Sequence, residues 1–227
     1  MTCKWDFFIC YLALGLIFAM DVGSLPAGDI KGKVIIKPIP PSKSKIVSRS
    51  IIQKYASKSA NNKEGAAHKP SVIVYIDGYR GGKPGTEKPV VVMDQNNEKF
   101  VPHVLPILVG TTVRFSNSDD VYHNVFSYSS TKSFNLGRYA KGKYRSIKFL
   151  KPGVVKVYCD IHTQMNAFIL VLENPYFATV DEDGNFLIKD IPPGTYTLKA
   201  WYGRWPEIEM QVEVKGSGAT EVNFVFP

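Results

Sequence analysis

Four side chains near the middle of the chain could together hold a metal ion. Cys159, His162 and Met165 lie within seven residues, and His123 precedes the cysteine by 36 positions. A thiolate, two imidazoles and a thioether are the donor set of a mononuclear blue-copper site. The pattern therefore predicts one copper ion that handles one electron at a time. Zinc is an alternative occupant because it also accepts two imidazoles and a thiolate, but the thioether favours copper.

The strand pattern around these residues indicates how they could meet. Val155, Val157 and Cys159 alternate with polar or aromatic residues and so share one face of a predicted strand. Met165 begins the next apolar alternation, and residues 160–164 form the intervening turn, which places His162 at the edge of the molecule. A catalytic site needs an open coordination position and a nearby acid or base. The sequence indicates neither, so we expect a metal protein that is not an enzyme.

The elements that must carry this site are predicted to be strands. Val, Ile, Phe and Tyr dominate short runs that Gly, Pro, Asn and Asp separate, which is typical of an all-β chain. The predicted strands are Lys33–Lys37, Ser71–Ile76, Val90–Met93, Thr112–Ser116, Arg145–Phe149, Val154–Cys159, Asn166–Leu172, Tyr176–Val180, Asn185–Ile188, Tyr196–Tyr202, Ile208–Val214 and Glu221–Phe226.

The central part of the chain resembles the cupredoxin family. The resemblance rests on Gly110-Thr-Thr-Val-Arg-Phe-Ser-Asn-Ser-Asp119, on His123-Asn124, on Pro152-Gly153 and on Tyr158-Cys-Asp-Ile-His162-Thr-Gln-Met165. Its ligand spacing is most similar to that of amicyanin, and it covers about 90–172. It implies a Greek-key β-sandwich at 88–172 that holds one type 1 copper ion.

The resemblance also implies a role for each site residue. His123, Cys159 and His162 would be equatorial copper ligands, Met165 the axial ligand, and Asn124 the neighbour that ties the histidine loop to the cysteine loop. His162 would be the route for electrons at the solvent edge. The chain departs from amicyanin and plastocyanin at Ile161, where those proteins carry proline, and its rim is more polar, so the partner surface does not carry over.

A second module is indicated near the C-terminus. The stretch from Asp181 to Ala200, with its Asp183-Gly184 turn and its Pro-Pro-Gly sequence, resembles the carboxypeptidase regulatory-like, or transthyretin-like, β-sandwich. Strands of that kind also occur near the N-terminus, so we expect one sandwich formed by 28–87 and 173–227, with the cupredoxin-like part inserted between them. Phe168 and Leu170 would then face the neighbouring module, since both faces of their strand are apolar. A tandem order is the alternative.

The first 27 residues look like a secretion signal, with an apolar run between Phe7 and Met20 followed by small residues. The sequence leaves open whether this segment is cleaved or stays as an anchor. Cleavage would remove Cys3 and Cys10 and leave Cys159 as the last cysteine, which could then form no internal disulfide. We therefore expect an exported protein, periplasmic or extracellular, in which metal binding explains the thiol. A buried inert thiol is the alternative.

The net charge of +8 favours acidic redox partners or an anionic membrane surface. Residues 38–69 form a basic segment, which could be a short amphipathic helix or a surface loop. No nucleic-acid-binding motif is present, and no nucleic-acid partner is expected.

Two further functions remain open beside electron transfer. The protein could store or deliver copper without a redox role, or be a structural cell-surface β-protein. His68 and His103 have no ligand spacing to other residues, and the acidic run at 181–183 is explained by a hairpin turn rather than a calcium loop.

Overall fold

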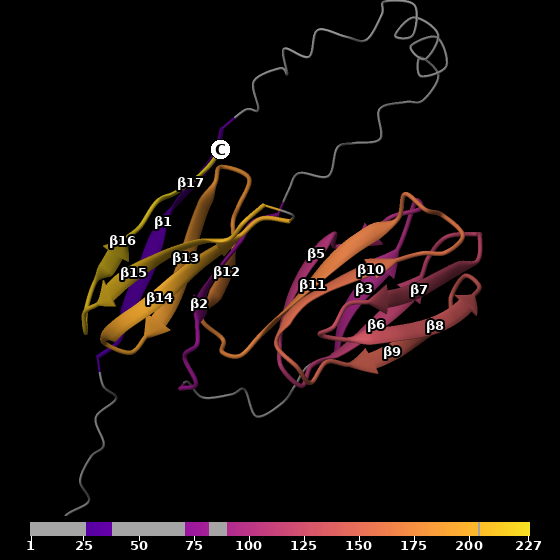
Figure 1. The fold of residues 1–227 in the computed structure, drawn as a ribbon, viewed down its shortest axis with the longest axis horizontal. Helices are drawn as coiled ribbons and strands as arrows, with labels where there is room; N and C mark the ends of the chain where they lie inside the picture. The colour runs from indigo at the N-terminus through magenta and orange to yellow at the C-terminus, as the bar shows by residue number, and fades with distance from the viewer. Residues whose placement is uncertain (1–25, 38–70, 82–89, 204) are drawn as a thin grey trace, which may run out of the picture.

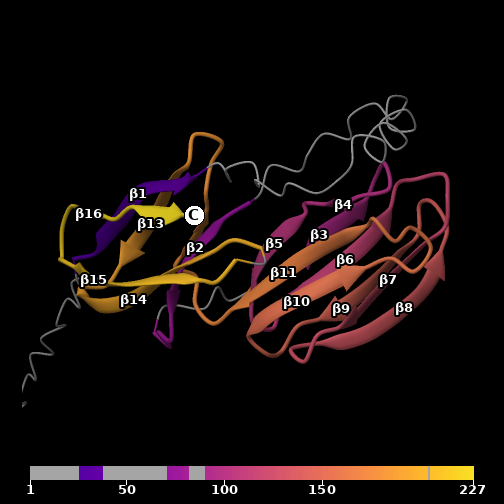
Figure 2. The same ribbon diagram turned by 45° about the horizontal axis from the view of Figure 1, so that its top comes forward.

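The computed structural model describes residues 26–37, 71–81, 90–203 and 205–227, and these consist of β-strands and their connections. The strands form two modules that lie side by side (Figure 1, Figure 2). The central module contains β3 to β11, and the flanking module contains β1, β2 and β12 to β17. The prediction of an all-β fold with two sandwiches is confirmed.

Two of the predicted segments fall mostly or wholly outside the described residues. The signal segment at 1–27 is described only at its last two positions, and the basic segment at 38–69 is not described. Within the described ranges, no helix has the length and apolarity that crossing a membrane requires.

The flanking module joins strands from both ends of the chain. Its strands are β1 (Gly28–Ile36), β2 (Ile73–Asp77), β12 (Phe177–Thr179), β13 (Asn185–Ile191), β14 (Gly194–Trp201), β15 (Ile208–Val214), β16 (Ala219–Glu221) and β17 (Phe224–Phe226). One sheet has the order β13-β1-β16, with β17 also paired to β1, and the other has the order β12-β2-β14-β15. A shared core that includes Ile30, Val74, Leu198 and Phe224 lies between them. The strands before and after the central module therefore belong to one hydrophobic core.

The central module is a sandwich of a five-stranded and a four-stranded sheet. Its strands are β3 (Val90–Gln95), β4 (Phe100–Val101), β5 (Val104–Leu108), β6 (Thr112–Asn117), β7 (His123–Tyr128), β8 (Ser133–Tyr139), β9 (Tyr144–Lys148), β10 (Gly153–Tyr158) and β11 (Asn166–Leu172). The sheet orders are β5-β11-β10-β7-β8 and β4-β3-β6-β9. Alternation buries Val113, Phe115, Val155 and Val157 completely between the two sheets, as the sequence predicts for the two residues of β10.

The two modules meet on the outer face of the five-stranded sheet. Odd positions of β11, such as Ile169, enter the core of the central module, whereas Leu170 and Phe168 belong to a separate apolar cluster with Ile73 and Trp201 of the flanking module. The Phe168 and Trp201 rings lie 5.3 Å apart in an edge-on arrangement. The prediction that Phe168 and Leu170 face the neighbouring module is confirmed.

Strands β4, β5, β7 and β8 were not predicted from the sequence. β5 contains Pro106, which argues against an interior strand, but β5 is an edge strand, where a missing amide donor is tolerated. β7 and β8 are rich in Ser, Asn and Gly and become strands by pairing with each other. Cross-strand pairing decides such polar segments more than intrinsic propensity does.

Candidate metal centre

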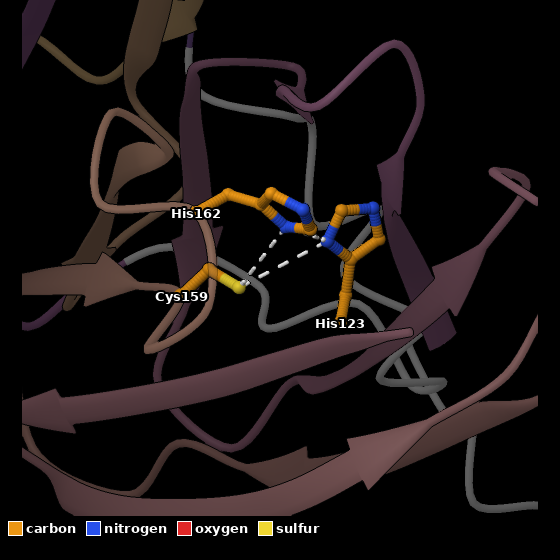
Figure 3. Close-up of side chains that lie close together, drawn as sticks. All are labelled: His123, Cys159 and His162. Carbon is orange, nitrogen blue, oxygen red and sulfur yellow. Dashed lines mark hydrogen bonds between the residues drawn. The ribbon is translucent and has the colours of Figure 1, made fainter. Parts of the chain in front are cut away.

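Three of the four predicted ligands converge at one end of the central module. His123 is the first residue of β7, Cys159 directly follows β10, and His162 lies in the turn between β10 and β11. Figure 3 shows the two imidazole rings and the thiol pointing toward a common point. His123 and Cys159 are buried, whereas His162 is half-buried and reaches the surface.

The separations between the three donor atoms fit a single metal ion. The Cys159 Sγ lies 3.9 Å from the Nδ1 of His123 and 3.9 Å from the Nδ1 of His162, and the two Nδ1 atoms are 3.0 Å apart. A circle through three such points has a radius of about 2.1 Å, which is close to metal–nitrogen and metal–sulfur bond lengths of about 2.0–2.3 Å. One ion can therefore contact all three donors with little movement of the side chains.

The turn that carries Cys159, His162 and Met165 is closed by its own backbone. The Met165 amide donates to the His162 carbonyl at 2.9 Å, and the Cys159 amide donates to the Met165 carbonyl at 3.3 Å. The Met165 side chain is 1% exposed and belongs to the same core cluster as Cys159. Three of the predicted ligands are thus held by one short hydrogen-bonded loop, with the thioether on the core side.

His123, which comes from a different strand, is oriented by a carboxylate. Its Nε2 lies 2.8 Å from an oxygen of Asp119. When the carboxyl group is ionised, this oxygen has no proton to donate and acts only as a hydrogen-bond acceptor. In a neutral ring the proton is then on Nε2, and Nδ1, which faces Cys159 and His162, keeps its lone pair. This is the tautomer that a metal ligand needs.

The Asp119 carboxyl group is held in its ionised form by its neighbours. Partial burial opposes ionisation, but hydrogen bonds from the Glu98 amide, the His123 ring and the Asn97 amide outweigh it and lower the pKa of Asp119 below its usual value. The two amide donors lie 2.9 Å and 2.6 Å from the carboxylate oxygens. The side chain of Asp119 is only 13% exposed, so these interactions are partly shielded from solvent.

Asn117 shapes the loop that presents Asp119 and His123. Its side-chain oxygen accepts the Asp119 amide at 2.9 Å, and its Nδ2 donates to the carbonyls of Val121 and Tyr139. The Asn117 side chain is 1% exposed. Asparagine is suited to this position because one side chain can accept from and donate to the backbone of the same loop.

Asn124 is buried beside the centre, at 2% exposure, but its side-chain oxygen has no hydrogen-bond partner among the described residues. Its predicted role in tying the histidine loop to the cysteine loop stays a prediction. Asp160 lies away from the centre, 3.2 Å from Arg138 on the protein surface.

The other described candidates, His103 and the acidic run at 181–183, make contacts elsewhere in the molecule. Among the described residues, the one cluster with the geometry of a metal site is His123, Cys159 and His162. His103 lies 3.3 Å from Asn166 and stacks edge-on against Phe168. The acidic run at 181–183 is a turn in which Asp181 accepts the amides of Asp183 and Asn185. His68 lies outside the described residues.

Asp119 and Asn117 are residues of the candidate site that the sequence interpretation missed. Both lie in the stretch that carries the family resemblance, and Asp119 precedes His123 by four positions. A carboxylate four residues before a candidate ligand was the available signal. Whether this carboxylate reaches the candidate ligand depends on a loop conformation that the spacing alone does not specify.

One family model matches the chain, at residues 164–222, and it describes domain II of polysaccharide lyase family 4. The match runs from the ligand turn through β11 and most of the flanking module. The matched family differs from the predicted carboxypeptidase regulatory-like one, and that finer resemblance stays a prediction. No curated protein matches the chain.

Solved structures of copper proteins are similar to part of the chain. A copper(I) form of an amicyanin variant is 22% identical, covers 36% of this chain and 81% of its own, and has a TM-score of 0.35. A second amicyanin variant, in its reduced form, is also 22% identical, covers 38% of this chain and 86% of its own, and has a TM-score of 0.35. A purple cupredoxin from Nitrosopumilus maritimus is 28% identical, covers 36% of this chain and 98% of its own, and has a TM-score of 0.33.

Proposed function

We propose that the protein is a type 1 copper protein that transfers single electrons. His123, Cys159 and His162 are the three strong ligands, and Met165 is the weak axial ligand. The observation that carries the proposal is the convergence of one thiol sulfur and two imidazole nitrogens within 4.8 Å of one another in a largely buried site. When bound there, copper supplies a one-electron couple.

The surrounding residues suit electron transfer better than catalysis. The donor set comes from a strand end, a closed turn and the start of a second strand, so its geometry is fixed by the sheet. A site that is already shaped for the metal changes little between oxidation states. His162 is the ligand at the surface and would be the point at which electrons enter and leave.

We further propose an exported protein with acidic redox partners. The sequence pI is about 9.2, and the central module presents exposed basic side chains around β9, namely Lys141, Lys143, Arg145, Lys148 and Lys151. Cys159 is a buried free thiol, which in an oxidising compartment is well explained by metal ligation. An anionic membrane surface is the alternative partner, since it would be recognised by the same charges.

The proposal is tested by the visible absorption spectrum of the full chain loaded with Cu(II). We expect an intense thiolate-to-copper band that bleaches with ascorbate and is absent in Cys159→Ser. Tight Cu(I) binding without this band would instead support storage or delivery of copper. Failure to bind stoichiometric copper would contradict the proposal altogether.

A further inference from the structure

The carboxylate of Asp119 connects the His123 ring to the β3–β4 turn, which lies outside the ligand loops. We propose that Asp119 is a positioning residue of the metal centre: it holds His123 in the metal-binding tautomer and couples the His123 loop to the His162 loop through the β3–β4 turn. The inference about copper rests on the proposed function, whereas the inference about the tautomer does not.

The orientation of the Asp119 carboxylate is fixed by hydrogen bonds to both of its oxygens. One oxygen of Asp119 accepts from the His123 Nε2 at 2.8 Å and from the Glu98 amide at 2.9 Å, and the other accepts from the Asn97 amide at 2.6 Å. The backbone of Asp119 is also fixed, because its amide donates to the buried Asn117 side chain. A carboxylate held at both oxygens cannot rotate away, so the imidazole must present its Nε2 proton to it.

The two backbone amides that bind the carboxylate come from the β3–β4 turn. Asn97 and Glu98 both have a φ of 53°, in the left-handed region, and the turn is closed by backbone hydrogen bonds between Asn96 and Lys99. A left-handed residue other than glycine costs about 1 kcal/mol. Successive amides in such a turn point to one side and form an anion-binding concavity, and here the anion is the Asp119 carboxylate.

The β3–β4 turn also contacts the loop that carries the second histidine, His162. The Glu98 carboxylate accepts a hydrogen bond from the Gln164 side chain at 2.7 Å, and Gln164 lies in the turn between His162 and Met165. The β3–β4 turn therefore contacts both ligand loops, one through Asp119 and one through Glu98. Displacement of either loop would break a hydrogen bond to the same turn.

The negative charge of the Asp119 carboxylate would also affect a bound metal ion. A histidine that donates its second ring proton to a carboxylate is a stronger donor than one that donates to a neutral acceptor. A stronger donor and a nearby negative charge both stabilise the doubly charged metal ion more than the singly charged one. Asp119 therefore favours Cu(II) over Cu(I) and lowers the reduction potential of the centre.

The first experiment measures the tautomer of His123 in the metal-free full chain by long-range proton–nitrogen NMR at neutral pH. We expect the Nε2–H form in the wild type and loss of this single form in Asp119→Asn. Because the wild-type spectrum is informative by itself, the test does not depend on the variant folding. A neutral His123 ring with its proton on Nδ1 in the wild type would overturn the proposal, whatever the metal.

The second experiment compares the reduction potentials of copper-loaded wild type, Asp119→Asn and Asp120→Asn. Asp120→Asn is the matched control because it removes the same charge one residue away, from a side chain that is 87% exposed and pairs with Lys141. Loss of such an outer partner typically weakens metal binding about 10–100-fold. If a tenfold loss falls on Cu(II) alone, the potential of Asp119→Asn rises by about 59 mV.

The outcomes separate this inference from the proposed function. A wild type without a blue band contradicts the copper assignment, yet the NMR result still decides the role of Asp119. A blue wild type whose potential shifts equally in Asp119→Asn and Asp120→Asn would show that only the net charge matters, and this would overturn the positioning role. Gln164→Ala should leave the His123 tautomer unchanged but broaden the signals of the His162 loop, and unchanged signals there would refute the coupling.

Discussion

At the scale of the residue, neighbouring groups fix the orientation of His123, Cys159 and Met165 in the candidate metal centre. The His123 ring is held by Asp119, and the loop around both is held by the buried amide of Asn117. Cys159 and Met165 are tied to each other through the backbone of one turn. The candidate centre is therefore held together by hydrogen bonds around the four predicted ligands.

Met165→Leu tests the proposed axial ligand. The two side chains are similar in volume, so the substitution at this fully buried position should cost less than about 1.5 kcal/mol of stability. Removing the weak thioether donor should destabilise Cu(II) relative to Cu(I) and raise the reduction potential, by about 59 mV for each tenfold change in relative affinity. Voltammetry of the copper-loaded variant measures this. A lowered potential would argue against axial ligation by Met165.

Tyr139 provides a prediction for alkaline pH. Its hydroxyl accepts a hydrogen bond from the Gln95 amide, and burial raises its pKa well above the usual value of 10.0 in spite of that bond. The native state therefore holds this proton more tightly than the unfolded state, and the resulting stability is complete below about pH 10 and lost as the pH rises above it. Thermal unfolding between about pH 9 and 11 should show a steeper loss for the wild type than for Tyr139→Phe.

The control for this comparison is Tyr128→Phe, because Tyr128 is 82% exposed. Its pH profile should match that of the wild type. Equal slopes for the wild type and Tyr139→Phe would contradict the role assigned to Tyr139.

At the scale of the element, β1 shows how one strand can bind partners on both sides. It pairs antiparallel with β13 along one edge, and along the other it pairs in parallel with β16 and then with β17. The change of partner occurs at Gly32, where the chain between β16 and β17 crosses closely. A Cβ on Gly32 would clash with the Val222 carbonyl oxygen, so only glycine allows this approach.

Gly32→Ala should therefore destabilise the flanking module. The clash is with backbone, which cannot rotate away, and overpacking of this kind costs about 1–3 kcal/mol or more. Gly203→Ala is the control. Gly203 has a φ of +55°, but a Cβ added there would meet nothing within 4 Å, so this variant isolates conformational strain of about 1 kcal/mol. Chemical denaturation followed by tryptophan fluorescence compares the two, and a smaller loss for Gly32→Ala than for Gly203→Ala would refute the steric argument.

At the scale of the whole molecule, the two modules share an apolar contact on the outer face of the five-stranded sheet, whereas Cys159 and Met165 lie in the core on its other face. Val154 is at the contact and Cys159 is at the centre, and these residues are separated by the length of β10, about 17 Å. Strand β11 likewise reaches the flanking module through Leu170 and the ligand turn through its first residue. The contact can therefore dock the modules while His162 stays accessible.

Trp201→Ala should weaken this docking without disturbing the metal centre. The Phe168–Trp201 pair is expected to contribute about 0.5–1.5 kcal/mol beyond its buried area, measurable in a double-mutant cycle with Phe168→Ala. Because fewer contacts would then join the modules, one unfolding transition should separate into two in calorimetry. Loss of the blue band in Trp201→Ala would contradict this separation between docking contact and metal centre.

The sequence by itself determined the strand-rich fold, the inward face of β10 and the donor types at positions 123, 159, 162 and 165, because alternation and ligand chemistry are local properties. It also indicated which face of β11 meets the neighbouring module, since Phe168 and Leu170 are apolar where one exposed face would be polar. Only the tertiary structure decided that Asp119 points at His123 and that Gln164 reaches Glu98. The geometry of these contacts follows from the packing of two sheets and the conformation of one turn. Residue spacing does not encode either.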